Sequence, residues 1–226
     1  MLVFHDVDIH IEGVHVLRRV RFRLEDGATA ALIGRNGAGK TTTLRAIMGF
    51  VPLSAGRIEV GGEDVGVIAP HQRAGLGIGY APEDRRLFSA FDVEGNLRLA
   101  GEVQGMDRPT LDARLGEVYD ILPELLTLRR RPAGSVSGGQ GKMVALGRAL
   151  VLGHRLILLD EPFQGLAPAL ANRYAEALRR LRERRTDVTL LVTESNPALL
   201  RGFADSMFEI ERGEVGLMDR ASEPSA

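Results

Sequence analysis

Cysteine and tryptophan are absent from this sequence of 226 residues, and aromatic residues make up only 5% of it. Without cysteine there can be no disulfide and no thiolate metal site, which fits a reducing compartment. No window approaches the roughly 20 uninterrupted apolar residues of a membrane-spanning helix. The first residues also lack the basic segment of a signal peptide. We therefore expect that, if the protein works at a membrane, another chain supplies the membrane part.

An excess of charge of one sign is also lacking, because 29 basic and 30 acidic residues give a formal net charge of −1. This excludes the whole-chain basic field that attracts nucleic acid or an anionic membrane surface, and we expect no nucleic-acid partner. Glycine, in contrast, is abundant at 27 residues, well above a usual share of roughly 7%. Its clustering favours backbone loops that approach a ligand, and the clusters lie at residues 34–39, 61–62, 75–79 and 138–141.

Three apolar runs predict strands that are buried on both faces of a parallel sheet. They cover residues 28–33, 156–159 and 188–192. Before the first run, residues 19–24 alternate arginine with apolar side chains and end at the turn of residues 26–27. That alternation is typical of a half-exposed strand.

Helical patterns dominate elsewhere. A helix is expected over residues 40–48, with Gly49 as its stop. Residues 91–152 contain helical patterns and no convincing strand, and Pro109 and Pro123 punctuate them. Apolar positions at helical spacing in this stretch include Leu111, Leu115, Val118 and Tyr119.

The elements predict one α/β domain over residues 1–226. Residues 1–90 and 153–220 would form a core with a mainly parallel sheet, helices on its faces and antiparallel strands at the N-terminal end. Residues 91–152 would be a helical subdomain inserted into this core. Residues 221–226 have the composition of a frayed tail.

A phosphate-binding loop follows the first buried strand. Residues 34–41 fit the pattern G-x-x-x-x-G-K-[ST] without a mismatch, and the strand before and helix after it are the context of a P-loop NTPase core, which is RecA-like. The backbone N–H groups and the helix N-terminus would surround phosphate. Lys40 would reach the β- and γ-phosphates of ATP, and Thr41 would ligate Mg²⁺. The candidate nucleotide ligands are Gly34, Arg35, Asn36, Gly37, Ala38, Gly39, Lys40, Thr41 and Thr42.

Two carboxylates, Asp160 and Glu161, follow the second buried strand directly. They lie where open α/β sheets bind ligands, at the carboxyl end of a strand. Beside a phosphate loop, Asp160 is expected to hold Mg²⁺. Glu161 is the candidate catalytic base that polarises the water attacking the γ-phosphate.

A third motif identifies a family resemblance. Residues 136–140, Val-Ser-Gly-Gly-Gln, nearly match the L-S-G-G-Q signature of ABC ATPases, and their distances from the other two motifs also resemble that family. Ser137 is an N-cap candidate, and the amides of Gly138 and Gly139 can face a phosphate. In the family this phosphate belongs to the nucleotide of a second ATPase subunit, so the resemblance implies that Ser137, Gly138, Gly139 and Gln140 of this chain complete the ATP site of that partner.

Finer features resemble the shorter ATPase subunit of branched-chain amino acid importers. They lie at residues 80–88, 92–97 and 159–168. Related urea and amide importers share them. The resemblance implies an ATPase at the cytoplasmic face of a membrane, bound peripherally to transmembrane permease subunits. A periplasmic or lipoprotein solute-binding protein would act indirectly.

Several positions depart from the general pattern. Glu83 stands in the coupling loop, where the resemblance places a glutamine in most ABC ATPases, and it is a third candidate metal ligand beside Thr41 and Asp160. The usual histidine after the third strand falls on Ser195, with Glu194 as the off-by-one alternative. Serine can hydrogen-bond a phosphate or water but cannot carry the charge of an imidazole, and Ser195 is retained as a catalytic candidate.

The adenine-stacking aromatic of the family falls near Ile11, beside His10. Gly141 and Lys142 replace the commoner residues after the signature, and residues 167–168 lack the usual aspartate. Each departure affects this chain's own nucleotide pocket or its subunit contacts. Together they imply a weaker site in an asymmetric pair with a non-identical ATPase subunit.

Two other functions remain open. One is a soluble ABC ATPase in DNA repair, chromosome or ribosome work. The repair type needs a long coiled-coil insert and the ribosome type needs two cassettes in one chain, and this sequence shows neither. A degenerate cassette would hold ATP without cleaving it. Retention of Glu161 argues against the second alternative, and loss of the histidine argues for it.

Overall fold

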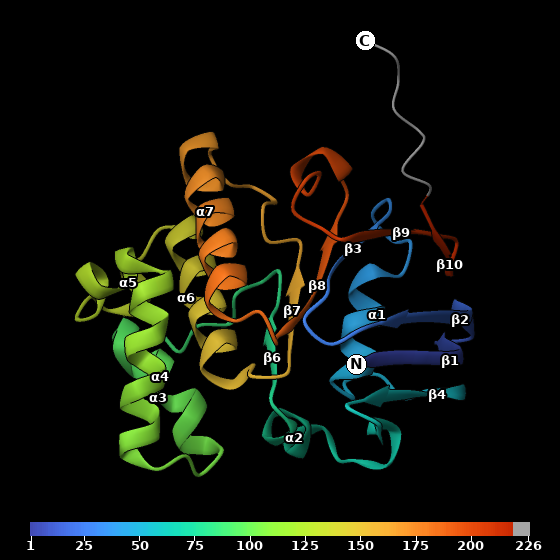
Figure 1. Ribbon diagram of the computed structural model, residues 1–226, viewed down its shortest axis with the longest axis horizontal. Helices are drawn as coiled ribbons and strands as arrows, with labels where there is room; N and C mark the ends of the chain where they lie inside the picture. Colours follow the sequence, from blue (N-terminus) through green and yellow to red (C-terminus); the bar gives the residue numbers. More distant parts are fainter. Residues whose placement is uncertain (219–226) are drawn as a thin grey trace.

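The computed structural model describes residues 1–218, whose strands form two sheets (Figure 1). The smaller sheet has the order β2-β1-β4-β5, and its neighbouring strands are antiparallel. Its strands are β1 (Leu2–Ile11), β2 (Val14–Leu24), β4 (Ala55–Val60) and β5 (Glu63–Asp64). The half-exposed strand predicted over residues 19–24 is the second half of β2.

The larger sheet has the order β10-β9-β3-β8-β7-β6, and its pairs are parallel except β9 with β10. Parallel pairing brings the carboxyl ends of β3, β7 and β8 to one edge. The strands are β3 (Thr29–Ile33), β6 (Ile78–Ala81), β7 (Leu156–Asp160), β8 (Thr189–Glu194), β9 (Ser206–Glu211) and β10 (Glu214–Leu217).

Helices cover both faces of the larger sheet (Figure 1). On one side α1 (Lys40–Ile47) lies between the two sheets. The other side carries α3 (Val93–Val103), α4 (Arg108–Ile121), α5 (Pro123–Leu128), α6 (Gly138–Leu152) and α7 (Pro168–Arg184). Short helices complete the chain: α2 (Pro70–Arg73), η1 (Val65–Val67), η2 (Ala74–Leu76), η3 (Ala133–Ser135) and η4 (Pro197–Leu199).

Side-chain alternation divides each central strand between two hydrophobic cores. In β3, Ala31 and Ile33 face the core of the helical layer, whereas Ala30 and Leu32 face the core that contains α1 and the smaller sheet. Successive side chains of a strand point to opposite faces. Both faces are therefore apolar, which explains the continuous apolar runs.

The two prolines that punctuate residues 91–152 lie in the first turns of helices. Pro109 lies in the first turn of α4, whose N-cap Asp107 accepts a hydrogen bond from the backbone of Thr110 at 2.8 Å. Pro123 opens α5. Proline is tolerated there because the first helical N–H groups have no partner within the helix.

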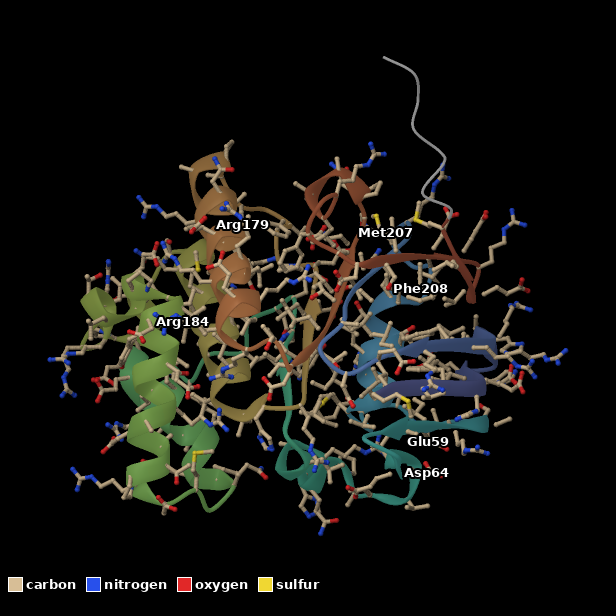
Figure 2. All side chains as sticks on the ribbon, viewed as in Figure 1. Glu59, Asp64, Arg179, Arg184, Met207 and Phe208 are labelled. Carbon is tan, nitrogen blue, oxygen red and sulfur yellow. The ribbon has the colours of Figure 1, made fainter. Side chains whose placement is uncertain are left out.

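Charged side chains cover the outer surface of the helical layer (Figure 2). Arg184 of α7 pairs with Asp120 of α4 at 2.9 Å, and both side chains are more than half exposed. Pairs so exposed contribute little stability, about 0–1 kcal/mol. The buried apolar side chains of α4 and α7 hold this layer together instead.

The predicted α/β fold is confirmed. The apolar runs became β3, β7 and β8, and the helix expected at residues 40–48 is α1, with Gly49 just beyond it at φ +74°. Residues 91–152 contain α3 to α6. The expected tail at 221–226 lies outside the described residues. No helix within residues 1–218 is long and apolar enough to cross a membrane.

Candidate nucleotide site

The predicted phosphate loop connects β3 to α1, and two of its glycines are required by close packing. A Cβ on Gly34 would lie 2.4 Å from the carbonyl oxygen of Ile210. Gly39, the N-cap of α1, has φ +116°, and a Cβ there would lie 2.8 Å from Leu17. Only glycine fits both places without strain, so the loop is held tightly against β2 and β9.

Lys40 is buried at the base of this loop, with 5% of its surface exposed. Its Nζ donates to the carbonyl oxygens of Gly34 at 2.6 Å and Arg35 at 3.0 Å, and to Ser195 Oγ at 3.1 Å. The same ammonium lies 2.9 Å from Glu161 Oε1. A buried charge needs such partners, and the contacts aim the ammonium at the loop.

Asp160, at the end of β7, lies beside the start of α1. Its Oδ1 accepts from Thr41 Oγ1 at 3.0 Å and Thr193 Oγ1 at 2.8 Å, and its Oδ2 accepts from the Tyr80 hydroxyl at 3.3 Å. Burial raises the pKa of Asp160 above its usual value, and the hydroxyl donors lower it. A nearby cation would offset the cost of burying this carboxylate.

The donor set fits Mg²⁺, since Thr41 and Asp160 present adjacent hard oxygen atoms. Mg²⁺ usually binds one or two carboxylates and takes its remaining ligands from water and substrate phosphates. Within residues 1–218 no group of three or more histidine, cysteine, aspartate or glutamate side chains could hold a metal. The site therefore fits a phosphate-bound Mg²⁺ and lacks an all-protein cage.

Glu161 has an unusual backbone, with φ +45°. Its N–H donates to Thr193 at 3.2 Å (carbonyl oxygen) and 3.1 Å (Oγ1), and its carbonyl oxygen accepts from Lys142 Nζ at 2.6 Å. Its side chain, 6% exposed, accepts from Ser195 Oγ at 2.8 Å and pairs with Lys40. Backbone and side chain are thus both held, with the carboxylate turned toward the phosphate loop.

Glu194 forms a second buried acid beside Glu161. It is 2% exposed, and its Oε1 accepts from the backbone N–H of Phe163 at 2.9 Å. Burial raises the pKa of Glu194 to about 7, and the neighbouring Glu161 adds to this effect. Two carboxylates this close in a buried place disfavour double ionisation.

Ser195, at the position expected for histidine, links the phosphate loop to Glu161. Its Oγ lies 3.0 Å from Asn36 Oδ1 and 2.8 Å from Glu161 Oε1, and accepts from Lys40. The side chain of the off-by-one residue Glu194 accepts from the backbone N–H of Phe163 instead. Glu194 contacts the loop through its backbone carbonyl, which accepts from the N–H of Gly34 at 3.2 Å, so Ser195 is the one of the two whose side chain contacts the loop.

These residues surround a hollow of about 220 Å³. It contains most of the predicted phosphate, metal and catalytic positions, and its lining is Val16, Asn36, Gly37, Gly39, Lys40, Thr41, Thr42, Glu83, Glu161 and Gln164. Glu83 also lines a neighbouring hollow of about 690 Å³, which includes Tyr80, Arg148 and Asp160. Glu83 therefore stands between the phosphate loop and this larger groove.

Ile11 and the signature residues do not line the small hollow. Of the other predicted residues, Gly34, Arg35, Ala38, Asp160 and Ser195 also lie outside its lining, and Asp160 lines the larger neighbouring hollow. Ile11 is 38% exposed and pairs with Val14 at the end of β1, whereas Val16 of β2 reaches the hollow. Ser137 and Gln140 border a different hollow of about 300 Å³. The predicted N-cap is confirmed, because Ser137 and Gln140 form a reciprocal capping box at the start of α6.

Sequence reasoning missed several residues that hold the site. Thr193 bonds both Asp160 and Glu161, and its position opposite Asp160 follows from the pairing of β7 with β8. Val16 lacks a motif, and Gln164 lies within the resembling segment 159–168 without being predicted as a site residue; both come near the phosphate loop through folding. The sequence marks Lys142 only as a departure from the usual signature. Its identity as one of two lysines in the chain was the available signal.

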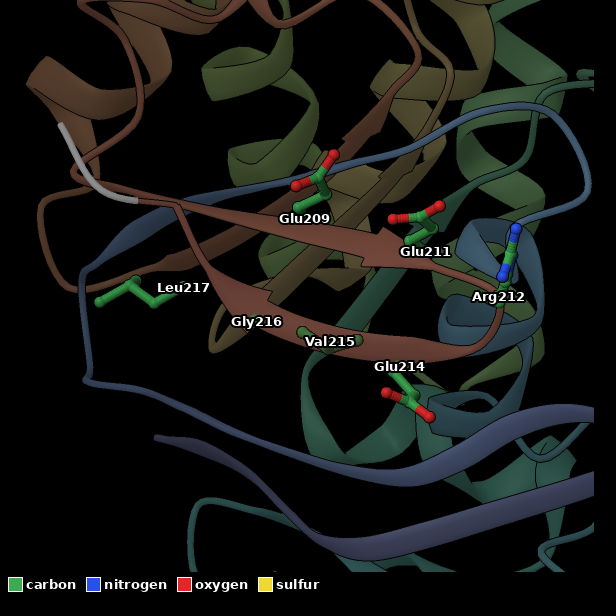
Figure 3. A pocket seen from close by; sticks show the side chains of 7 residues that line it. All are labelled: Glu209, Glu211, Arg212, Glu214, Val215, Gly216 and Leu217. Atoms are coloured by element: carbon green, nitrogen blue, oxygen red, sulfur yellow. The ribbon is translucent and has the colours of Figure 1, made fainter. Parts of the chain in front are cut away.

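A further hollow, of about 500 Å³, lies at β9 and β10 (Figure 3). It is mainly acidic and contains none of the predicted site residues; its lining is Glu209, Glu211, Arg212, Glu214, Val215, Gly216 and Leu217. Carboxylates repel phosphate, so this surface does not suit a nucleotide.

Comparison with known proteins finds consistent similarities. Residues 17–164 match the sequence model of a family described as ABC transporter. The chain is 33% identical to the high-affinity branched-chain amino acid transport ATP-binding protein BraG of Pseudomonas aeruginosa, over 97% of this chain and 92% of BraG. It is 30% identical to the lipopolysaccharide export system ATP-binding protein LptB of Escherichia coli, over 90% and 84%. An ABC transporter ATP-binding cassette in its ADP conformation superposes with a TM-score of 0.83 at 25% identity, covering 96% and 89%.

Proposed function

Because the chain belongs to the ABC transporter family of ATP-binding proteins, we propose that it hydrolyses ATP to drive a membrane transporter. One observation carries the proposal: Lys40, Thr41, Asp160 and Glu161 meet at a single edge of the parallel sheet. Together they provide a phosphate-binding cation, oxygen ligands for a metal and a carboxylate aimed at the phosphate loop.

The reaction is phosphoryl transfer from ATP to water, in which positioning and charge stabilisation supply most of the catalysis. The loop amides and Lys40 bind the β- and γ-phosphates. Thr41 and Asp160 would hold Mg²⁺, which would supply positive charge to neutralise the phosphates. Glu161 accepts the proton of the attacking water. Ser195, bonded to Glu161 and Asn36, orients the carboxylate in place of a charged imidazole.

Two ATPase subunits complete the working unit. The signature residues of this chain border a different hollow from the phosphate loop, which supports a role at the nucleotide of a partner. Since Ser195 lacks a charge, the partner is proposed to be non-identical and to carry the stronger catalytic site. Residues 1–90 and 153–220 then serve as the nucleotide-binding core, and residues 91–152 present the signature.

Permease contact is proposed at the groove of about 690 Å³ that Glu83 shares with the nucleotide hollow. A change at the γ-phosphate would reach this groove through Glu83. The chain would then bind peripherally to permease subunits at the cytoplasmic face of the membrane. A solute-binding protein would act on the other side without touching it.

The proposed solute is a branched-chain amino acid, taken up rather than exported. Support comes from BraG, the more similar of the two relatives above, and from residues 80–88 around Glu83, which resemble the shorter ATPase subunit of branched-chain amino acid importers. In this proposal the groove binds the permease and the hollow binds ATP, so neither identifies the solute and transport has to be measured directly.

The test combines hydrolysis with uptake. Purified chain, alone and with its partner ATPase and permease, should release phosphate from Mg-ATP, and Lys40→Ala should abolish this release. The matched control is Arg108→Ala, which removes a cation whose side chain is 90% exposed. In cells, disrupting the gene should lower leucine uptake but leave urea uptake unchanged. Loss of urea uptake alone would reject the amino-acid assignment.

A further inference from the structure

The basic residues of this chain are almost all arginine. It has 27 arginines and two lysines, Lys40 and Lys142. The two lysines are far apart in the sequence, yet both bond the same residue. Lys40 Nζ lies 2.9 Å from the carboxylate of Glu161, and Lys142 Nζ lies 2.6 Å from its backbone carbonyl oxygen. Lys142 has no place in the reaction described above.

Lys142 extends from the second turn of α6 to the end of β7. Burial lowers the pKa of its ammonium, while the carboxylates of Glu194, Glu83 and Glu161 raise it. An ammonium in this place loses hydration, so its bond to a carbonyl oxygen is worth more than at the surface. The position suits a structural cation directed at one peptide group.

That peptide group belongs to a residue in a sparsely populated conformation. A non-glycine residue at φ +45° is strained and persists where its surroundings fix it. The N–H of Glu161 is fixed by Thr193, and its carbonyl is fixed by Lys142. Losing Lys142 would free one side of this arrangement, and the carboxylate would no longer be held toward the phosphate loop.

The helix that carries Lys142 begins in the signature, because Gly138, Gly139 and Gln140 form the first turn of α6. Gly138 accepts a hydrogen bond from Arg85 Nη1 at 3.2 Å, and a Cβ on Gly141 would lie 3.0 Å from the Arg85 side chain. Since α6 is continuous from Gly138 to Leu152, a shift of its first turn also moves the root of Lys142. The signature turn and the carbonyl of Glu161 are therefore mechanically connected within one chain.

We propose that Lys142 is a positioning residue, which holds the backbone of Glu161 so that the Glu161 carboxylate is aligned for hydrolysis. Because Lys142 belongs to α6, a shift of the first turn of α6 also shifts this carboxylate. The inference rests on the proposed ATPase function. Lys142 is not itself catalytic, because it bonds a peptide oxygen and does not line the nucleotide hollow. It should therefore affect the chemical step and leave ATP binding unchanged.

Steady-state kinetics and equilibrium binding separate these effects. Lys142→Met keeps the length of the side chain and removes the donor, and we expect kcat to fall at least tenfold while the Kd for Mg-ATP stays within twofold. Lys142→Arg restores a donor and should return kcat to within threefold of the native chain. In a Glu161→Gln background, Lys142→Met should change the residual rate by less than twofold, because Lys142 acts through Glu161.

Lysine scarcity allows a direct measurement that does not depend on activity. A chain labelled with ¹⁵N-lysine should give two ammonium signals by NMR, assigned with Lys142→Arg. The Lys142 signal should be protected from exchange with water, as expected of a bonded ammonium. Should Lys142→Met fail to fold, this signal and Lys142→Arg decide the matter. An unprotected signal would overturn the inference.

The remaining outcomes are equally decisive. Three results for Lys142→Met would reject the positioning role. They are a fall in kcat of less than tenfold, a loss of ATP affinity as large as the fall in kcat, and an equally large fall in rate when Glu161 is already replaced by glutamine. In each of these cases the native chain still hydrolyses ATP, so the proposed function stands. If the native chain neither binds nor cleaves ATP with its partner, the proposed function fails, and a role for Lys142 in hydrolysis falls with it.

Discussion

Glu161→Gln tests the candidate site most deeply, because Glu161 has two separate effects on it. Its carboxylate forms an ion pair with the Lys40 ammonium, with Oε1 and Nζ 2.9 Å apart, and both side chains are nearly buried. A phosphate that binds at Lys40 must share this ammonium with Glu161. The amide of glutamine keeps the shape and a neutral acceptor, while the carbonyl oxygens of Gly34 and Arg35 continue to hold Lys40.

The expected change in ATP affinity follows from this exchange. Hydrogen bonds to charged groups contribute about 1.5–3 kcal/mol and neutral ones about 0.5–1.5 kcal/mol. The substitution therefore weakens the interaction of residue 161 with Lys40 by roughly 1–1.5 kcal/mol. If ATP no longer has to displace that interaction, Mg-ATP binds about five- to tenfold more tightly. Hydrolysis should fall by about 10²- to 10⁴-fold, the usual contribution of a general base.

Fluorescence titration with a labelled ATP analogue measures the affinity, and single-turnover phosphate release measures the rate. Size-exclusion chromatography should also show an ATP-dependent dimer trapped before hydrolysis. Glu209→Gln is the matched control, since it makes the same chemical change on β9 (Figure 3) and should alter neither value. Turnover at the native rate would remove Glu161 as the base. Unchanged or weaker ATP affinity would show that Glu161 does not compete for Lys40.

Three further predictions concern neighbouring groups. Lys40→Ala should weaken Mg-ATP binding from ten- to more than a hundredfold, because it removes charged hydrogen bonds worth about 1.5–3 kcal/mol each; unchanged affinity in a folded variant would contradict the phosphate role. Ser195→His should raise the ATPase rate of the isolated chain about tenfold, or about 1.4 kcal/mol, whereas vigorous native turnover with no gain would refute the asymmetric pair. The pKa of Glu194 is raised to about 7 from 4.5, so its contribution to stability is complete below pH 4.5 and is lost as pH rises through 7. Urea unfolding at pH 5–8 should therefore show a smaller loss of stability with rising pH in Glu194→Gln, and an unaltered slope would count against the buried acid pair.

Local patterns were sufficient for the parts of the site that are continuous in the chain. The phosphate loop has its loop, strand and helix within a short segment, and each feature is dictated by neighbouring residues. The capping box of Ser137 and Gln140 is local in the same sense. Apolar runs also predicted β3, β7 and β8, because strands buried on both faces must be apolar throughout.

The sequence by itself thus determined the phosphate loop and the strand-end position of the acids Asp160 and Glu161, since each depends on adjacent positions. That Ser195 takes the place of a histidine stays a prediction from the family resemblance. The tertiary structure alone decided how they meet. The order β3-β8-β7 places Ser195 against both Lys40 and Glu161 and places Thr193 opposite Asp160. A pattern of buried residues does not specify which strands become neighbours, because every parallel order buries the same faces. Contacts from other elements, such as Lys142 on Glu161, depend on how the helices pack on that sheet.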